Sequence, residues 1–285
     1  MKLALSALTA TSIFVLAACT APADVEDTAT TDVETAVTET EEVVAETVDA
    51  APAMLDAILA AQPEETQARY GARNPAETLA FFGIEPGMTV AEALPGGGWY
   101  SKILIPYVGA EGELVGAHYP DVMWSVIFPD GDAERIQGVI DRANGWADGT
   151  AEWGIENGAK VSQFKMTTAD DEIDGKLDAF LFIRAMHNLH RAEAESGIFT
   201  ETVAETYDLL KPGGVVGVVQ HRAPESNSDD WADGNAGYLK QSRVVAAFEA
   251  VGFVLEATSE VNANPDDQPT EDDVVWRLPP VAAGT

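Results

Sequence analysis

The chain has 285 residues, of which 46% are hydrophobic and 8% aromatic, so wholesale disorder is excluded. Its 16 Lys and Arg residues against 48 Asp and Glu residues give a net charge of −32, which repels nucleic-acid phosphates and anionic lipid surfaces. The single cysteine excludes an intrachain disulfide and a thiolate metal cluster. We therefore expect an acidic globular protein that does not bind nucleic acid.

The N-terminus has the features of a secretory leader. Lys2 is followed by an apolar run from Leu3 to Ala17, shorter than the roughly 20 residues that a transmembrane helix needs. The run ends at Cys19 and resembles the bacterial lipoprotein signal, which implies cleavage before Cys19 and lipidation of its thiol. A buried helix with a small buried cysteine is the alternative. By the same resemblance, Thr20 at the next position favours the outer membrane, so we expect a lipid-anchored, periplasm-facing protein.

Residues 20–50 differ in composition from the rest of the chain. They include ten acidic residues and no Lys, Arg or aromatic residue. Such a segment buries too little apolar area to offset its chain entropy, and its like charges repel one another. We therefore divide the chain into a leader (1–18), the lipidated cysteine with an acidic tether (19–50) and one domain (51–285).

Within the domain, helical and strand patterns alternate in chain order. The spacing of apolar residues predicts helices at 54–59, 75–82, 99–108, 133–147, 198–210 and 238–251. Strands are predicted at 88–94, 113–118, 161–166, 177–183, 215–219, 253–255 and 274–276. The run from Leu177 to Ile183 is almost wholly apolar, as is typical of a central parallel strand. The sequence therefore predicts an α/β, doubly wound, mostly parallel seven-stranded sheet.

A glycine-rich bend follows the first predicted strand of the domain. Glu92 stands near the end of that strand, and Gly96, Gly97 and Gly98 precede the next helix. Consecutive glycines let the backbone approach a ligand, and the helix N-terminus offers free N–H groups. The pattern resembles motif I of class I S-adenosylmethionine-dependent methyltransferases, with Leu94 where the first glycine is expected. A dinucleotide fingerprint requires other glycine offsets, and a tight turn without a ligand is the remaining alternative.

The resemblance extends over about residues 64–280, to a bacterial, often exported, branch of predicted methyltransferases. The matching segments are Arg73 to Glu77, Phe82 to Val90, Met186 to His190, Leu209 to Gly214, and Val275 to Pro280. It implies a Rossmann-like methyltransferase fold, S-adenosylmethionine as the cofactor, and contacts from Glu92 and the three glycines. In place of the acid that ends the second strand in such enzymes and binds the ribose, this chain has His118. The acid after the third strand, which meets adenine, corresponds to Asp170 or one of its neighbours.

All four histidines (His118, His187, His190 and His221) lie at or just beyond the carboxyl ends of predicted strands, at the sheet edge where open α/β sheets bind ligands. We consider His187, with Asn188 and His221, as the candidate catalytic set, because a neutral imidazole can accept a proton from a methyl acceptor. Two alternatives stay open: the histidines bind loop backbone only, or His187 and His190 hold a metal with His221 or an acid. Arg184, at the end of a strand, is a candidate partner of Glu92, and the long stretch 119–160 is a candidate lid over the acceptor.

Together these features predict an exported lipoprotein that transfers a methyl group from S-adenosylmethionine to a small or envelope acceptor. The alternative is a ligand-binding protein that uses the same scaffold without catalysis, since S-adenosylmethionine is made in the cytoplasm.

Overall fold

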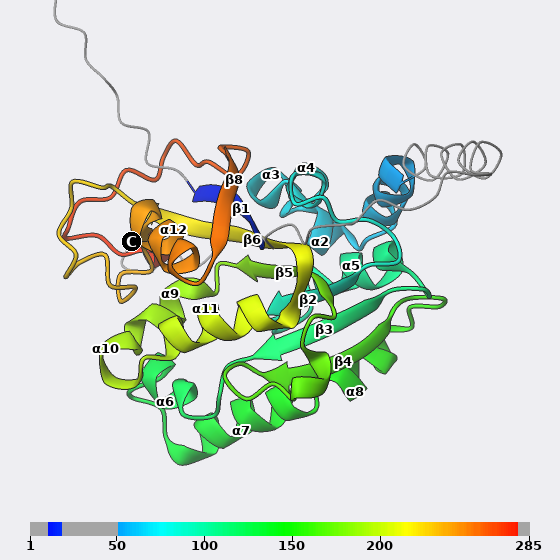
Figure 1. Ribbon diagram of the computed structural model, residues 1–285, viewed down its shortest axis with the longest axis horizontal. Coiled ribbons are helices and arrows are strands. Elements are labelled where there is room, and N and C mark those ends of the chain that lie inside the picture. The colour runs from blue at the N-terminus through cyan, green and yellow to red at the C-terminus, as the bar shows by residue number, and fades with distance from the viewer. Residues whose placement is uncertain (1–10, 19–50, 279–285) are drawn as a thin grey trace, which may run out of the picture.

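The computed structural model describes residues 11–18 and 51–278, and its centre is one twisted sheet (Figure 1). β2, β3, β4, β5 and β6 form parallel ladders with their neighbours, whereas β1 runs antiparallel to both β6 and β8. Along the sheet the order is β4 (Lys160–Lys165), β3 (Glu113–His118), β2 (Thr89–Ala93), β5 (Leu177–Ile183), β6 (Leu210–Ala223), β1 (Thr11–Ala18) and β8 (Phe253–Ser259), and the short β7 (Leu239–Lys240) pairs with β6. The predicted fold class is confirmed.

Helices cover both faces of the sheet (Figure 1). The face that carries Ala91 and Ala93 packs on α6 (Met123–Ile127), α7 (Ala133–Asn144), α9 (Met186–Arg191), α11 (Ile198–Leu209) and α12 (Gln241–Ala250). The opposite face carries Val90 and packs on the helical residues 51–60, α4 (Pro75–Phe81), α5 (Ser101–Val108) and α8 (Trp146–Gly149). The remaining short helices are α2 (Glu64–Gln67), α3 (Tyr70–Arg73), α10 (Glu193–Ser196), η1 (Thr150–Trp153), η2 (Asp171–Ile173) and η3 (Val275–Arg277). Because side chains alternate along a strand, Glu92 shares the face of Val90.

One strand differs from the prediction. Residues 274–276 were expected to form the last strand, but Val275–Arg277 form the 3₁₀ helix η3. The apolar run is short, and the backbone N–H of Val275 donates to Ala236 O at 2.9 Å, which holds the segment against a loop and away from the sheet. The antiparallel strand is instead β1, whose Val15 lies opposite Gly217 of β6.

Strand β1 belongs to the segment that the sequence identifies as a leader, so cleavage before Cys19 would remove this strand from between β6 and β8. Residues 1–10 and Cys19 lie outside the described residues, so lipidation at Cys19 remains a prediction, as does the tether at 19–50. Within the described ranges, 11–18 and 51–278, no helix is both long and apolar enough to cross a membrane.

Candidate active site

The bend between β2 and α5 holds its shape through three residues with positive φ. Gly96 and Gly98 have φ of 55° and 75°, and Leu94 has φ of 51°. A left-handed backbone is costly for leucine, so this position retains the conformation that a glycine would take without strain. A Cβ at Gly98 would lie 2.2 Å from the ring of Trp153, so that position has no room for a side chain. The left-handed backbone at these positions and the packing of Trp153 on Gly98 thus both restrict which residues the bend can contain.

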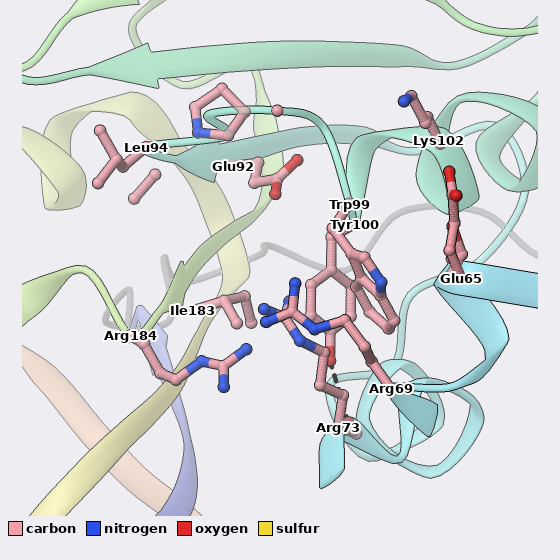
Figure 2. A pocket seen from close by; sticks show the side chains of 14 residues that line it. Glu65, Arg69, Arg73, Glu92, Leu94, Trp99, Tyr100, Lys102, Ile183 and Arg184 are labelled. Carbon is pink, nitrogen blue, oxygen red and sulfur yellow. Dashed lines mark hydrogen bonds between the residues drawn. The ribbon is translucent and has the colours of Figure 1, made fainter. Parts of the chain in front are cut away.

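The bend opens onto a cavity of about 550 Å³, within the range of small-molecule sites. Its walls come from the end of β2, the bend, the start of α5, the short helices α2 and α3, and the end of β5. Figure 2 shows the guanidinium groups of Arg69, Arg73 and Arg184 converging on the space below Glu92. The cavity is lined by Glu65, Thr66, Arg69, Arg73, Glu92, Ala93, Leu94, Pro95, Gly97, Trp99, Tyr100, Lys102, Ile183 and Arg184. In a chain of net charge −32, four cationic side chains against two acidic ones make this wall locally positive.

Glu92 is the buried acid of this cavity, with 4% of its surface exposed. Its Oε2 accepts a hydrogen bond from Ser101 Oγ at 2.6 Å, at the start of α5. Burial raises the pKa of Glu92 to about 7, against the opposing effects of the Ser101 hydrogen bond and the positive charge of Arg73. Near neutral pH the carboxyl group is thus close to half ionised, and a cation placed beside it would ionise it fully.

Arg73 lies across the cavity at the C-terminal end of α3. Its guanidinium carbon lies 4.4 Å from the ring centroid of Trp99, and its backbone oxygen accepts a hydrogen bond from Tyr100 Oη at 3.1 Å. Burial, together with repulsion from Arg184 and Arg69, lowers the pKa of Arg73 to about 9. Its buried Nε has no hydrogen-bond partner among the described residues. An anion bound here would satisfy a donor that the protein itself leaves unpaired.

A second cavity, of about 500 Å³, lies on the other side of Arg184. His187 of α9, His221 of β6 and Trp276 of η3 line it, together with the loop 262–267 and residues near α3. The stretch 119–160, predicted as a lid, lines neither this cavity nor the first. The stretch instead supplies buried side chains to the core, among them Trp124 and Trp146.

Both histidines of the second cavity are neutral at physiological pH. Burial lowers the pKa of His187 to about 4, although its Nδ1 lies 3.4 Å from Gln220 Oε1, a contact that opposes the shift. Burial, followed by the positive charge of Arg184, lowers the pKa of His221 to about 3. His187 also packs edge-on against Trp276, with ring centroids 6.0 Å apart. Each neutral imidazole has a lone pair that can accept a proton, but a pKa of about 4 or 3 makes it a weaker base than an ordinary imidazole.

Other predicted site residues do not reach the cavities. His118 ends β3 but packs against Trp146, with ring centroids 5.4 Å apart and its Nε2 buried without a hydrogen-bond partner among the described residues. Asp170 is exposed and caps η2 by accepting the N–H of Glu172. Neither position lines the cavity beside Glu92. The ribose and adenine contacts expected there are therefore not assembled by these residues.

The remaining two candidates near α9 have other partners. Asn188 donates through Nδ2 to Tyr119 Oη at 3.5 Å, and the Tyr119 hydroxyl in turn donates to Ala185 O. His190 Nδ1 lies 2.7 Å from Asp233 O, and its Nε2 accepts from Arg243, so His190 ties α9 to the loop between β6 and β7 and to α12. Within 51–278, no group of three or more His, Asp or Glu residues is arranged to hold a metal ion. Both ring nitrogens of His190 are thus engaged by other residues of the protein.

Among the described residues Glu92 forms no ion pair with Arg184, the partner considered from the sequence; its Oε2 accepts a hydrogen bond from Ser101. Sequence reasoning missed Arg69 and Arg73, which come from short helices without a recognisable pattern. Three signals were available: Lys and Arg are rare, with only 16 in the whole chain, Arg69 and Arg73 are one helical turn apart, and Arg73 begins a segment that carries the family resemblance.

Comparisons with known proteins gave only distant structural similarities. No family model matches the chain, and no curated protein matches it. A SAM-dependent methyltransferase from Aquifex aeolicus is 17% identical with a TM-score of 0.43, covering 67% of this chain and 88% of that one. The YcgJ protein from Bacillus subtilis is 19% identical with a TM-score of 0.42, covering 63% and 67%. CrArsM, an arsenic(III) S-adenosylmethionine methyltransferase from Chlamydomonas reinhardtii, is 18% identical with a TM-score of 0.39, covering 70% and 61%. At these values the similarity does not extend to function, so the proposals below rest on this chain's own residues.

Proposed function

We propose that the protein is an S-adenosylmethionine-dependent methyltransferase, exported as a lipoprotein and acting on a small or envelope acceptor. The observation that carries the proposal is the arrangement of the first cavity, in which one buried acid, Glu92, lies opposite several arginines. This arrangement complements an amino acid, whose ammonium group would meet Glu92 and whose carboxylate would meet Arg73 and Arg69. S-adenosylmethionine carries such a group at its methionine end, and the glycine bend beside Glu92 supports a close backbone contact.

The fit is good at the amino-acid end and incomplete at the other end. The unpaired Nε of Arg73 and the pKa of Glu92 both favour an amino-acid group in the first cavity. At the end of β3, however, the imidazole of His118 replaces a carboxylate and is turned into the core. The ribose hydroxyls would thus be held without the expected acid, and we expect weaker binding of the adenosine part than of the amino-acid part.

When bound, the cofactor supplies a methyl group on a positively charged sulfur. Glu92, Arg73 and Arg69 would hold its amino-acid end, and its sulfur would act as the leaving group, keeping the electron pair of the carbon–sulfur bond when an acceptor nucleophile takes the methyl group. We propose that His187 or His221, which both line the second cavity, takes the proton that the acceptor loses. Arg184, which lines both cavities, would lie at the boundary where the two reactants meet.

A binding experiment tests this proposal most simply. Isothermal titration of the full chain with S-adenosylhomocysteine, methionine and adenosine should give the tightest binding for S-adenosylhomocysteine and measurable binding for methionine. Glu92→Gln should weaken both, whereas Glu113→Gln, a partly exposed acid that also accepts from a serine at 2.6 Å, should weaken neither. Absence of binding by S-adenosylhomocysteine at millimolar concentration, with the protein folded, would refute the methyltransferase proposal.

A ligand-binding protein without catalysis is the second candidate, and the burial of His118 is the observation that favours it. In that case the first cavity would take a free amino acid. Methionine would then bind as tightly as S-adenosylhomocysteine, and no methyl transfer would be detected with any acceptor.

Export and anchoring are proposed from the leader alone. Replacement of Cys19 by Ser should leave the precursor unlipidated. In a detergent-partitioning experiment the variant should then no longer behave as a membrane-associated protein. If Cys19→Ser protein remained membrane-bound, lipidation at Cys19 would not be the anchor.

A further inference from the structure

Arg184 holds an unusual place between the two cavities. It directly follows β5, and its backbone N–H donates to Val219 O of β6 at 2.7 Å, which fixes its position at the sheet edge. Its φ of 57° lies in the left-handed region, which is rare for a residue with a long side chain. Strained conformations of this kind cluster at binding and catalytic positions. Figure 2 shows the side chain extending from the end of its strand into the first cavity.

Among the residues that the structure describes, no carboxylate forms an ion pair with the guanidinium of Arg184, and its side chain makes no hydrogen bond. Its surroundings are instead repulsive, because Arg73 and Arg69 lie near enough that all three charges disfavour one another. Guanidinium groups removed from water are costly unless an anion pairs with them.

The second cavity offers no such anion in its interior. Of its two acids, Asp267 is buried and engaged by Tyr238 Oη at 2.6 Å and by Arg277 Nη2 at 3.2 Å. Asp266 is exposed at the rim. The two histidines are neutral, and Arg184 is the one positively charged side chain among the residues that line this cavity, a position it shares with the wall of the first cavity.

We propose that Arg184 recognises an anionic group, carboxylate or phosphoryl, on the molecule that enters the second cavity. This inference rests on the proposed function, in which that molecule is the methyl acceptor. With its anionic group on Arg184, the acceptor would place its nucleophile between the boundary with the first cavity and the neutral imidazoles of His187 and His221. Neutral analogues of the acceptor would leave the guanidinium unpaired and would be rejected.

The test uses matched pairs of small molecules that differ only in charge. Carboxylic acids from acetate to benzoate are each compared with the corresponding primary amide, and phosphate monoesters with the parent alcohols. Each compound is added to the full chain with and without saturating S-adenosylhomocysteine, and the shift in melting temperature is measured. The variants are Arg184→Gln, Arg184→Lys and, as a control, Arg142→Gln on the exposed side of α7.

We expect at least one acid or monoester to raise the melting temperature of the wild type and of Arg142→Gln while its neutral partner does not. Arg184→Gln should lose that shift and Arg184→Lys should recover part of it. Since Arg184→Gln removes an unpaired charge, it should itself fold and melt no lower than the wild type, which a purely structural arginine would not do. Equal shifts for acids and amides, no shift for any pair, or unchanged shifts in Arg184→Gln would overturn the inference. Binding of S-adenosylhomocysteine, measured separately, distinguishes this outcome from failure of the proposed function.

Discussion

Glu92→Gln should make the protein more stable near neutral pH and less able to bind its ligand. Glutamine has the shape of the protonated acid and can still accept the hydrogen bond from Ser101 Oγ, which lies 2.6 Å from the Glu92 carboxyl group. The substitution therefore removes the burial of a charge and leaves the packing in place.

The magnitude follows from the pKa of Glu92, which burial raises from 4.5 to about 7. Each pKa unit corresponds to about 1.4 kcal/mol, so ionisation of the folded protein costs on the order of 3 kcal/mol. The folded protein keeps the Glu92 proton at pH values where the unfolded chain has lost it. The contribution of the protonated group is therefore fully present below pH 4.5 and is lost as the pH rises through 7. We expect Glu92→Gln and the wild type to be equally stable near pH 4 and to differ by roughly this amount above pH 7.

Urea unfolding of both proteins at intervals from pH 4 to pH 8 measures this difference directly. Other titrating groups, including the buried histidines, change both proteins alike and cancel in the comparison. Glu113→Gln, which removes a partly exposed acid with an equally short serine contact, is the control and should show no such pH-dependent gain. A Glu92→Gln protein that is less stable than the wild type at pH 8 would refute the reasoning, because the carboxylate would then be stabilising.

Three further substitutions test the bend, the buried imidazole and the second cavity. Gly98 has a φ of 75°, and a Cβ there would clash with the Trp153 ring, whereas Gly213 has a φ of 80° and open space around it. In urea unfolding, Gly98→Ala should therefore lower the free energy of unfolding by about 1 kcal/mol or more beyond the loss in Gly213→Ala. Burial lowers the pKa of His118 to about 4, so the folded wild type is destabilised as acid protonates the unfolded chain. The free energy of unfolding of His118→Phe should exceed that of the wild type by an amount that grows as the pH falls from 6.5 to 4. A difference that stays constant with pH would contradict this. His187→Gln should abolish methyl transfer with S-adenosylhomocysteine affinity unchanged, and parallel loss of both would reassign His187 to binding or structure.

Much of the fold could be predicted because its signals are local. The run from Leu177 to Ile183 is apolar at almost every position and forms the central strand β5, and Glu92 with the following glycines marks the end of β2. Strand β1 could not be predicted, because its sequence has the composition of a leader and its place between β6 and β8 depends on residues about 200 positions away.

The site was only partly predictable for a related reason. Leu94 looked like a departure from the glycine pattern, yet its backbone takes the left-handed conformation that a glycine would take. His118 occupies the predicted strand end, but its ring packs against Trp146 of α8, a contact that the local sequence does not indicate. Arg69 and Arg73 are four residues apart, the spacing of one helical turn, but that they lie opposite Glu92 depends on the tertiary fold.

Proton release on ligand binding tests the central claim most directly. If the ammonium group of S-adenosylhomocysteine meets Glu92, binding at pH 7 should ionise a carboxyl group that is about half protonated and release about half a proton per ligand. Titrations in phosphate and in Tris buffer, whose ionisation enthalpies differ, give this number from the difference in heat. We predict that the release disappears in Glu92→Gln, whereas binding without proton release, or an equal release in the variant, would contradict the account.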